Sequence, residues 1–220
     1  MRNVIGQFKR NVLCSYDLKG SSLNRKTDFE IDNVHKIVMK DLNFDEIEKC
    51  LLLNKVDIER LRFACMTDAY FLNDMDIMDY SLFVVKISLN KEEIEEIFGI
   101  RSNSDLSLIE KDEMTSNIQN ISLNTTDQRI PIFNNISELE HYRKYLYRSL
   151  NDKIVYIIAI IDYLQIYNFY KYLETNVKMY LKSRPEKMQD ISCVPPEIYC
   201  ARFIDYVKKI TQIPEMNCQK

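Results

Sequence analysis

Glycine is scarce in this chain, which has only Gly6, Gly20 and Gly99 among its 220 residues. A glycine-rich phosphate loop needs at least two closely spaced glycines, so the sequence holds neither a P-loop nor a Rossmann turn. Long apolar runs are also missing. The longest, residues 154–161, has the length of a strand and falls far short of the roughly 18 residues that span a bilayer. These absences exclude two common nucleotide-binding loops and a hydrophobic transmembrane helix within the sequence.

Paired cysteines are missing too, because the six cysteines are scattered and no two form a C-x-x-C pair. Zinc sites are usually built from such pairs, so zinc is not expected. Scattered reduced thiols are typical of a cytosolic protein. What is present is a chain with 46% apolar residues, long enough for one domain with a full core.

The net charge of −3 is unevenly distributed. Residues 1–40 hold eight Lys/Arg against four Asp/Glu. A local basic patch of this kind lets a chain approach an anionic surface whatever its total charge.

The apolar pattern predicts strands and helices that do not alternate regularly. Residues 11–17 predict a strand that leads into a polar turn at 19–24, and residues 81–87 and 154–161 predict buried strands. Residues 57–74 predict a helix with Asp57 as its N-cap. The buried stripe of that helix is predicted to be Ile58, Leu61, Cys65, Ala69 and Leu72, at steps of three and four. This arrangement favours an α+β fold.

The second half of the chain predicts further elements. Residues 102–135 are rich in Ser, Asn, Thr and acidic residues and predict a poorly ordered insertion. Residues 138–150 predict a short helix, and Asn168 is expected to cap another. Pro195 and Pro196 open a last helix. Its apolar face is expected to contain Tyr199, Phe203, Val207 and Ile210.

Two aspartates lie beside predicted strands. Asp162 ends the buried run 154–161, where a carboxylate can hold Mg²⁺ that bridges phosphate oxygens. Asp79 precedes the strand at 81–87, where it can orient an attacking hydroxyl or take its proton. From spacing alone, an aspartate in a solvated or capping turn is the favoured explanation of each.

Basic residues supply candidate phosphate contacts. Lys19 lies in a glycine-containing turn and can reach a phosphate as a point charge, and Arg25 can add a bidentate contact. Lys171, Lys178 and Lys182 share one face of the helix expected after Asn168, which suits an anionic membrane surface. Solvated turn and surface lysines are the alternative interpretation.

Several motifs, taken in order, resemble the signature of the phosphatidylinositol phosphate kinases. The resemblance covers most of the chain outside residues 90–150. It is carried by Asp17-Leu18-Lys19-Gly20-Ser21, Met78-Asp79-Tyr80-Ser81-Leu82, Ile160-Ile161-Asp162-Tyr163-Leu164-Gln165 and Tyr199-Cys200-Ala201-Arg202-Phe203.

The resemblance implies a role for each matched residue. Asp79 corresponds to the catalytic aspartate, Asp162 to the metal-binding aspartate, and Lys19 to the lysine near the transferred phosphate. Residues 166–190 resemble the activation loop, which docks on the membrane and selects the lipid. In this segment Glu174 matches the glutamate typical of 4-phosphate 5-kinases.

The resemblance also implies an architecture and a reaction. Residues 1–214 would form the carboxyl-terminal, protein-kinase-like lobe of the domain, starting at the hinge and without the amino-terminal lobe that covers ATP. With Mg²⁺ and ATP, the reaction would phosphorylate the 5-hydroxyl of phosphatidylinositol 4-phosphate at the plasma membrane, from the cytoplasmic side. A homodimer stays open, and nucleic acid is not an expected partner. The alternative function is a catalytically inactive phosphoinositide-binding or scaffold module.

Overall fold

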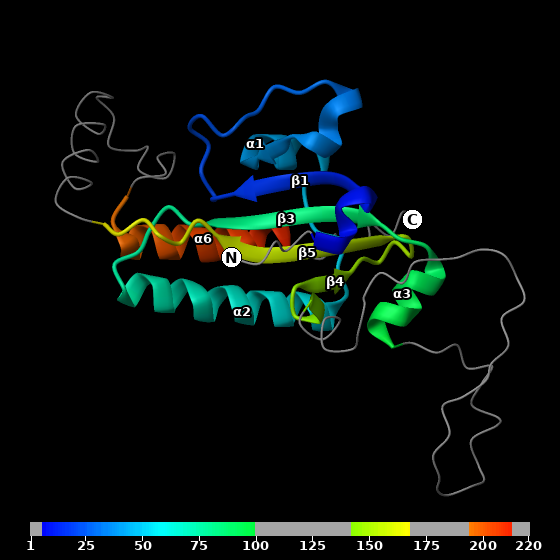
Figure 1. The fold of residues 1–220 in the computed structure, drawn as a ribbon. Helices are drawn as coiled ribbons and strands as arrows, with labels where there is room; N and C mark the ends of the chain where they lie inside the picture. Colours follow the sequence, from blue (N-terminus) through cyan, green and yellow to red (C-terminus); the bar gives the residue numbers. More distant parts are fainter. Residues whose placement is uncertain (1–5, 100–141, 168–193, 213–220) are drawn as a thin grey trace, which may run out of the picture.

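The computed structural model describes residues 6–99, 142–167 and 194–212, and these residues form one five-stranded sheet with helices on both faces (Figure 1). The strand order is β2-β1-β3-β5-β4. The strands are β1 (Val12–Leu18), β2 (Val38–Lys40), β3 (Ser81–Ser88), β4 (Leu146–Arg148) and β5 (Ile154–Ile161). β1 and β2 are parallel, and the other neighbouring pairs are antiparallel.

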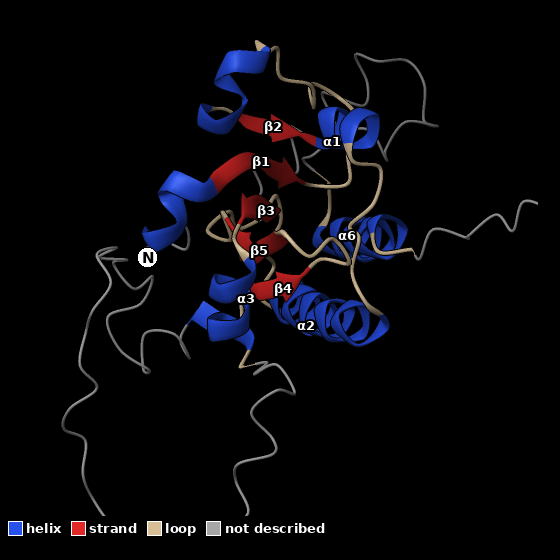
Figure 2. Cartoon of the chain, turned by 90° about the vertical axis from the view of Figure 1, so that its right-hand side faces the viewer, coloured by secondary structure: helices blue, strands red, loops and turns tan. Residues whose placement is uncertain are grey.

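Two long helices and one short helix lie on one side of the sheet, and other short helical segments lie against the opposite face (Figure 2). The described α-helices are α1 (Asp41–Ile47), α2 (Lys55–Asp74), α3 (Lys91–Phe98) and α6 (Pro196–Ile210), and the 3-10 helices are η1 (Gly6–Asn11) and η2 (Ile31–Lys36). α2 and α6 form the two-helix layer. The predicted α+β class is therefore the observed one. None of the described helices is long and apolar enough to cross a bilayer.

Strands β3 and β5 are buried on both faces of the sheet, which explains their nearly continuous apolar runs. In β3, Leu82 and Val84 pack with α2 and α6 in the larger core, whereas Val85 and Ile87 pack with α3 and η1 in the smaller one. β5 alternates in the same way. A strand with two buried faces has apolar side chains at successive positions, as the sequence predicts for residues 81–87 and 154–161.

Helix α2 confirms the predicted buried stripe but not the predicted cap. Its buried residues are Ile58, Leu61, Cys65, Ala69 and Leu72. The helix begins at Lys55, two residues before the predicted start, and Asn54 is its N-cap. The Asn54 side chain accepts a hydrogen bond from the Asp57 backbone N–H at 2.9 Å. Asp57 therefore lies in the first turn, where a negative charge favours the helix dipole.

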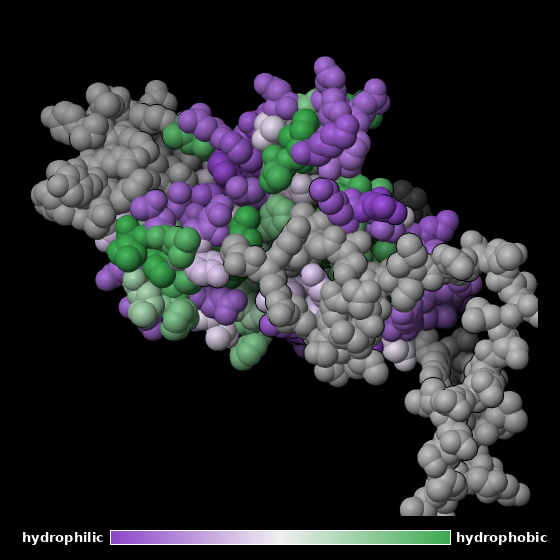
Figure 3. Space-filling model, viewed as in Figure 1, coloured by the Kyte–Doolittle hydropathy of each residue, from purple (hydrophilic) through white to green (hydrophobic). Residues whose placement is uncertain are grey.

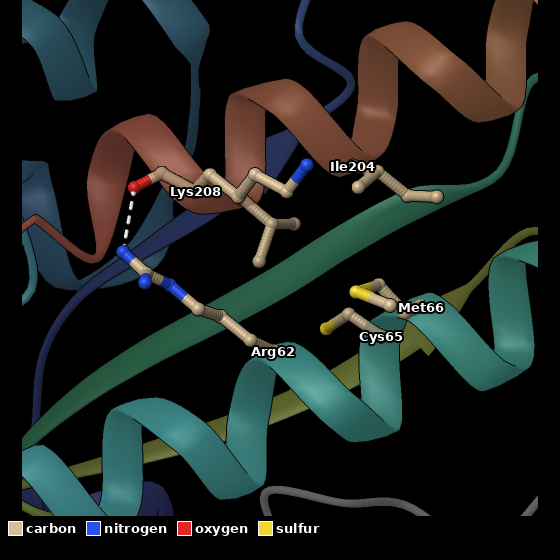
Figure 4. Close-up of a pocket in the computed structure, with 6 residues that line it drawn as sticks. Arg62, Cys65, Met66, Ile204 and Lys208 are labelled. Atoms are coloured by element: carbon tan, nitrogen blue, oxygen red, sulfur yellow. Dashed lines mark hydrogen bonds between the residues drawn. The ribbon is translucent and has the colours of Figure 1, made fainter.

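Arg62 of α2 caps the carboxyl end of α6. Its Nε donates to Thr211 Oγ1 at 2.8 Å, and its Nη2 donates to the carbonyl oxygens of Lys208 and Thr211 at 3.1 Å each. Figure 4 shows Arg62 extending from α2 toward Lys208 of α6. Cys65 of α2 and Ile204 of α6 line the pocket between the two helices. The last carbonyls of a helix lack intrahelical partners, so this arginine satisfies them and fixes the two helices together.

The predicted helix at 138–150 is wrong at residues 146–148, although residues 142 and 143 are helical. Leu146–Arg148 form β4, which pairs with β5, and Leu146 and Tyr147 are buried. Pairing with β5 outweighs the weak local helix preference of this short stretch. Residues 102–135 and the helix expected after Asn168 lie outside the described residues.

Candidate active site

The sheet brings the ends of three strands to one edge. β1 and β5 both run antiparallel to β3, so their carboxyl ends meet the amino end of β3. Leu18 pairs with Leu82, and Ile161 pairs with Ser81. Lys19 follows β1, Asp79 precedes β3 by two residues, and Asp162 follows β5. Three residues separated by up to 143 positions in the sequence therefore lie at the same edge, on the left in Figure 1.

Lys19 and Asp79 form the centre of this edge. The Lys19 ammonium donates to Asp79 Oδ1 at 2.8 Å and to the Asp79 backbone carbonyl at 2.7 Å. Lys19 is 9% exposed, whereas the Asp79 side chain is 32% exposed. Because an ammonium has three donors, Lys19 can hold Asp79 and still donate to a ligand.

Both candidate catalytic aspartates have left-handed backbone conformations. The φ angle is 65° at Asp79 and 60° at Asp162. A non-glycine residue rarely adopts this conformation, and such residues cluster at functional sites. At each position the chain turns sharply between a strand and a loop. The two carboxylates are thereby placed at the edge of the sheet instead of on its faces.

The turn before Asp79 is tied to the segment after Asp162. Ile77 forms an isolated antiparallel bridge with Ile166. The Met78 N–H donates to the Gln165 carbonyl at 3.0 Å, and the Tyr167 N–H donates to the Asp76 carbonyl at 2.7 Å. These contacts hold the two aspartate-bearing turns as one unit.

Arg25 lies inside a buried cluster of charges behind Lys19. Its Nε donates to Asp41 Oδ2 at 2.6 Å, and its Nη2 donates to Asp17 Oδ1 at 2.8 Å. Burial alone would raise the pKa of Asp17. The Ser81 hydroxyl and the positive charges of Arg25 and Lys19 outweigh that effect and lower this pKa. The two carboxylates in turn raise the pKa of Arg25 despite its burial.

Helix α6 supports the site from behind. Gly20 has a φ of 70°, and a Cβ on it would lie 2.8 Å from Tyr206 Cβ, so the turn after Lys19 lies directly on α6. The Tyr199 hydroxyl donates to the Tyr80 carbonyl, next to Asp79. The Arg202 guanidinium lies 4.8 Å from the centre of the Tyr199 ring. Burial lowers the pKa of Arg202, against the opposing effects of Tyr199, Asp41 and Asp79.

The structure brings some of the predicted residues together and leaves others outside the described ranges. Lys19, Asp79 and Asp162 share one edge. Arg25 is close behind them, but its Nε and Nη2 already bind carboxylates, so its geometry suits a role in holding the turn. The residues predicted for lipid selection and membrane docking, which are Glu174, Lys171, Lys178 and Lys182, lie outside the described residues.

Sequence reasoning missed Asp41, Tyr199 and Arg202 as parts of this site. Asp41 opens helix α1 and contacts residues 16 to 22 positions earlier in the chain, so no local pattern reveals it. The sequence does show the i, i+3 spacing of Tyr199 and Arg202 on the last predicted helix. That spacing indicates only that the two side chains are neighbours on one helix face.

The donor set at this edge fits a magnesium ion that is held together with a substrate. Among the described residues, no group of three or more His, Cys, Asp or Glu side chains could hold a metal by itself. Mg²⁺ commonly binds through one or two carboxylates plus substrate phosphates, with water completing the octahedron. Asp162, exposed at the strand end, is a suitable carboxylate.

Comparisons with known proteins identify the family to which the chain is similar. The model of the family described as phosphatidylinositol-4-phosphate 5-kinase matches residues 1–210. A protein from Plasmodium falciparum named phosphatidylinositol 4-phosphate 5-kinase is 24% identical over 199 residues, covering 88% of this chain and 10% of its own length. Phosphatidylinositol 4-phosphate 5-kinase 5 from Arabidopsis thaliana is 31% identical over 231 residues, covering 91% of this chain and 28% of its own length. The chain thus spans less than a third of either relative.

Proposed function

The chain belongs to the phosphatidylinositol-4-phosphate 5-kinase family, and from this premise we propose that it forms the carboxyl-terminal lobe of a lipid kinase. The reaction is transfer of the γ-phosphate of ATP to the 5-hydroxyl of phosphatidylinositol 4-phosphate. The observation that carries the proposal is the meeting of Lys19, Asp79 and Asp162 at one edge of the sheet, with Lys19 bonded to Asp79 at 2.8 Å.

Asp79 orients the lipid hydroxyl and accepts its proton. A carboxylate offers about four acceptor positions, so Asp79 can hold the Lys19 ammonium and a substrate hydroxyl at the same time. Lys19 places a positive charge beside the hydroxyl. It therefore stabilises negative charge on the transferring phosphoryl group with the ammonium hydrogen that Asp79 does not use.

Asp162 holds Mg²⁺ in this proposal, together with the phosphates of ATP. The metal supplies charge neutralisation and alignment of the phosphate oxygens. The turn contacts between residues 76–78 and 165–167 keep Asp162 in register with Asp79. Transfer depends on positioning, so this rigid link supports the assignment of the two carboxylates to one reaction.

Exposed apolar side chains at the same end of the molecule support a lipid substrate. Phe71 and Met75 near the end of α2 are 63% and 53% exposed, and Leu164 and Ile166 after β5 are 86% and 57% exposed. Figure 3 shows apolar residues gathered at the left, where these segments lie in Figure 1. An exposed apolar patch beside a site suits peripheral contact with a membrane, here the cytoplasmic face of the plasma membrane.

An inactive phosphoinositide-binding module is the second candidate. The sequence contains no glycine-rich loop to cover the phosphates of ATP, and the matched region is a small part of each relative. We therefore expect residues 1–220 alone to show little or no lipid kinase activity, because phosphoryl transfer draws charge neutralisation from two lobes.

A chimera separates the two candidates. Residues 1–220 are fused behind the amino-terminal lobe of an active relative, and ³²P transfer from ATP to vesicles containing phosphatidylinositol 4-phosphate is measured. The chimera should be active. Asp79→Asn and Asp162→Asn should each lower kcat by at least about 100-fold, the size typical of a positioned proton-transfer group.

Asp152→Asn is the matched control, because Asp152 is exposed in the turn between β4 and β5 and should leave kcat unchanged. A folded, inactive chimera that still binds these vesicles would favour the binding module. Wild-type rates in both aspartate variants would refute the site assignment.

A further inference from the structure

Asp41 is a buried carboxylate with no assigned role in the reaction. It is the first residue of α1 and is 2% exposed. Burying a carboxylate costs several kcal/mol unless it is paired and hydrogen-bonded. Asp41 meets this requirement with three donors: the backbone N–H groups of Lys19 and Gly20, and the Arg25 guanidinium.

The two backbone contacts fix the turn that carries Lys19. Asp41 Oδ1 accepts from Lys19 N at 2.9 Å and from Gly20 N at 2.7 Å. On its other side, Gly20 presses against Tyr206 of α6. The turn is thus held between the Asp41 carboxylate and helix α6.

The contact with Arg25 extends this anchor to the sheet. Arg25 bridges from Asp41 Oδ2 to Asp17 of β1, and the Leu42 N–H donates back to the Arg25 carbonyl at 3.0 Å. Asp41 therefore joins α1, the 19–25 turn and the carboxyl end of β1. Asp41 contacts the backbone N–H of Lys19, whereas the Lys19 ammonium binds Asp79.

We propose that Asp41 is a positioning residue, which holds the backbone of residues 19–20 so that the Lys19 ammonium lies between Asp79 and the phosphate of the lipid headgroup. The inference rests on the proposed function, because it assigns Lys19 to an anionic lipid phosphate. Asp41 itself touches no substrate. Without its Oδ1 acceptor, the buried Lys19 N–H and the part-buried Gly20 N–H lose their partner, and the turn must move to find water.

The alternative is that Asp41 only stabilises the fold, and Asn43 provides the matched control. Asn43 lies two positions along α1 and is fully buried. Its side chain binds the backbone of Thr27 and Lys40, away from the 19–20 turn. Asn43→Ala therefore removes three part-buried hydrogen bonds of a residue on the same helix and leaves the Asp41 contacts with Lys19 and Gly20 in place.

The test is a double-mutant cycle in the chain of residues 1–220. The variants are Lys19→Ala, Asp41→Ala, the double variant and Asn43→Ala. The probe is phosphatidylcholine vesicles with and without phosphatidylinositol 4-phosphate, in a co-sedimentation assay at low salt, with the melting temperature of each variant recorded.

Lys19→Ala should weaken binding to the phosphoinositide vesicles about fivefold, the size expected for one basic residue at an anionic surface. Asp41→Ala should weaken it by a similar factor, and the double variant should be no weaker than Lys19→Ala. Asn43→Ala should lower the melting temperature and leave the vesicle affinity unchanged. Such non-additivity is the signature of two residues that act through one contact.

The possible failures are distinguishable. If Lys19→Ala binds like the wild type, both the proposed lipid contact of Lys19 and the inference fail. Only the positioning role of Asp41 fails in two other cases, in both of which Lys19→Ala weakens binding. In the first, the effects of Lys19→Ala and Asp41→Ala add in the double variant. In the second, Asn43→Ala weakens vesicle binding as much as Asp41→Ala does. If Asp41→Ala does not fold, Asp41→Asn replaces it. Asparagine keeps the Oδ1 acceptor for the Lys19 and Gly20 N–H groups, but its NH2 group replaces the oxygen that accepts from Arg25 Nε. This variant should therefore have a lower melting temperature but bind within about twofold of the wild type, and a loss of binding equal to that of Lys19→Ala would overturn the inference.

Discussion

Replacing Gly20 by alanine tests how tightly the Lys19 turn is seated on α6. The new Cβ would lie 2.8 Å from Tyr206 Cβ and 3.2 Å from Tyr206 Cγ. Real Cβ atoms essentially never approach so closely. Tyr206 Cβ is attached directly to the helix backbone, so rotating the side chain cannot relieve the contact. Either α6 or the turn must move.

The expected magnitude has two parts. Gly20 has a φ of 70°, and a left-handed conformation costs an L-residue about 1–2 kcal/mol. Overpacking of a well-packed site costs typically about 1–3 kcal/mol more. Gly99→Ala is the control, because Gly99 has a φ of 68° but its nearest contact is the movable Arg143 Nη2 at 3.4 Å. Gly99→Ala should therefore carry only the backbone cost.

The assay is urea unfolding of residues 1–220, with the free energy of unfolding obtained by linear extrapolation. Alanine also reduces the freedom of the unfolded chain, but equally in both variants, so that contribution cancels in the comparison. Gly20→Ala should be less stable than Gly99→Ala by about 1–3 kcal/mol, the size of the steric part. Equal losses in the two variants would show that the turn can leave α6 freely. The description of Lys19 as rigidly placed would then be wrong.

Two further predictions concern ionisable groups. Asp17 has a lowered pKa in the folded chain, so its contribution to stability is complete above its unfolded pKa of about 4 and is lost as pH falls through the lower folded value. In the wild type the urea midpoint should fall as the pH drops below about 4, and Asp17→Asn should make this fall smaller. A variant whose urea midpoint depends on pH as the wild type does would contradict this. Burial raises the pKa of Cys65 to about 12 and leaves the residue 4% exposed, so iodoacetamide at pH 8 should not alkylate it in the native chain. Peptide mapping by mass spectrometry should instead find the label on the partly exposed Cys50, and early labelling of Cys65 would show that α2 opens.

The sequence predicted those parts of the fold in which burial leaves a periodic trace. The stripe of α2 and the apolar runs of β3 and β5 were predictable because residues that face a core must be apolar at fixed intervals. The cap of α2 was misplaced because both Asn54 and Asp57 are good N-cap residues. β4 was missed because three residues carry no period of their own, and their strand form depends on β5.

The candidate site was predictable only in part. Lys19, Asp79 and Asp162 were found by resemblance, but their spacing along the chain gave no sign that they share an edge. That convergence follows from the antiparallel order of β1, β3 and β5. Asp41 could not be found from sequence, because its partners are distant in the chain and become neighbours only when α1 packs beside β1.

The attachment points of residues 100–141 have a consequence for how the chain can vary in length. Gly99 and Arg143 lie close together, since the Arg143 Nε donates to the Ile97 carbonyl at 2.7 Å, and α3 is at the opposite end of the sheet from Asp79 and Asp162 (Figure 1). Because the two flanking positions lie side by side, added chain between them costs little closure entropy, about 0.6 kcal/mol for each doubling of a flexible connection. This position is therefore the natural one for insertions, deletions or an inserted reporter domain, which would leave the lysine–aspartate edge undisturbed.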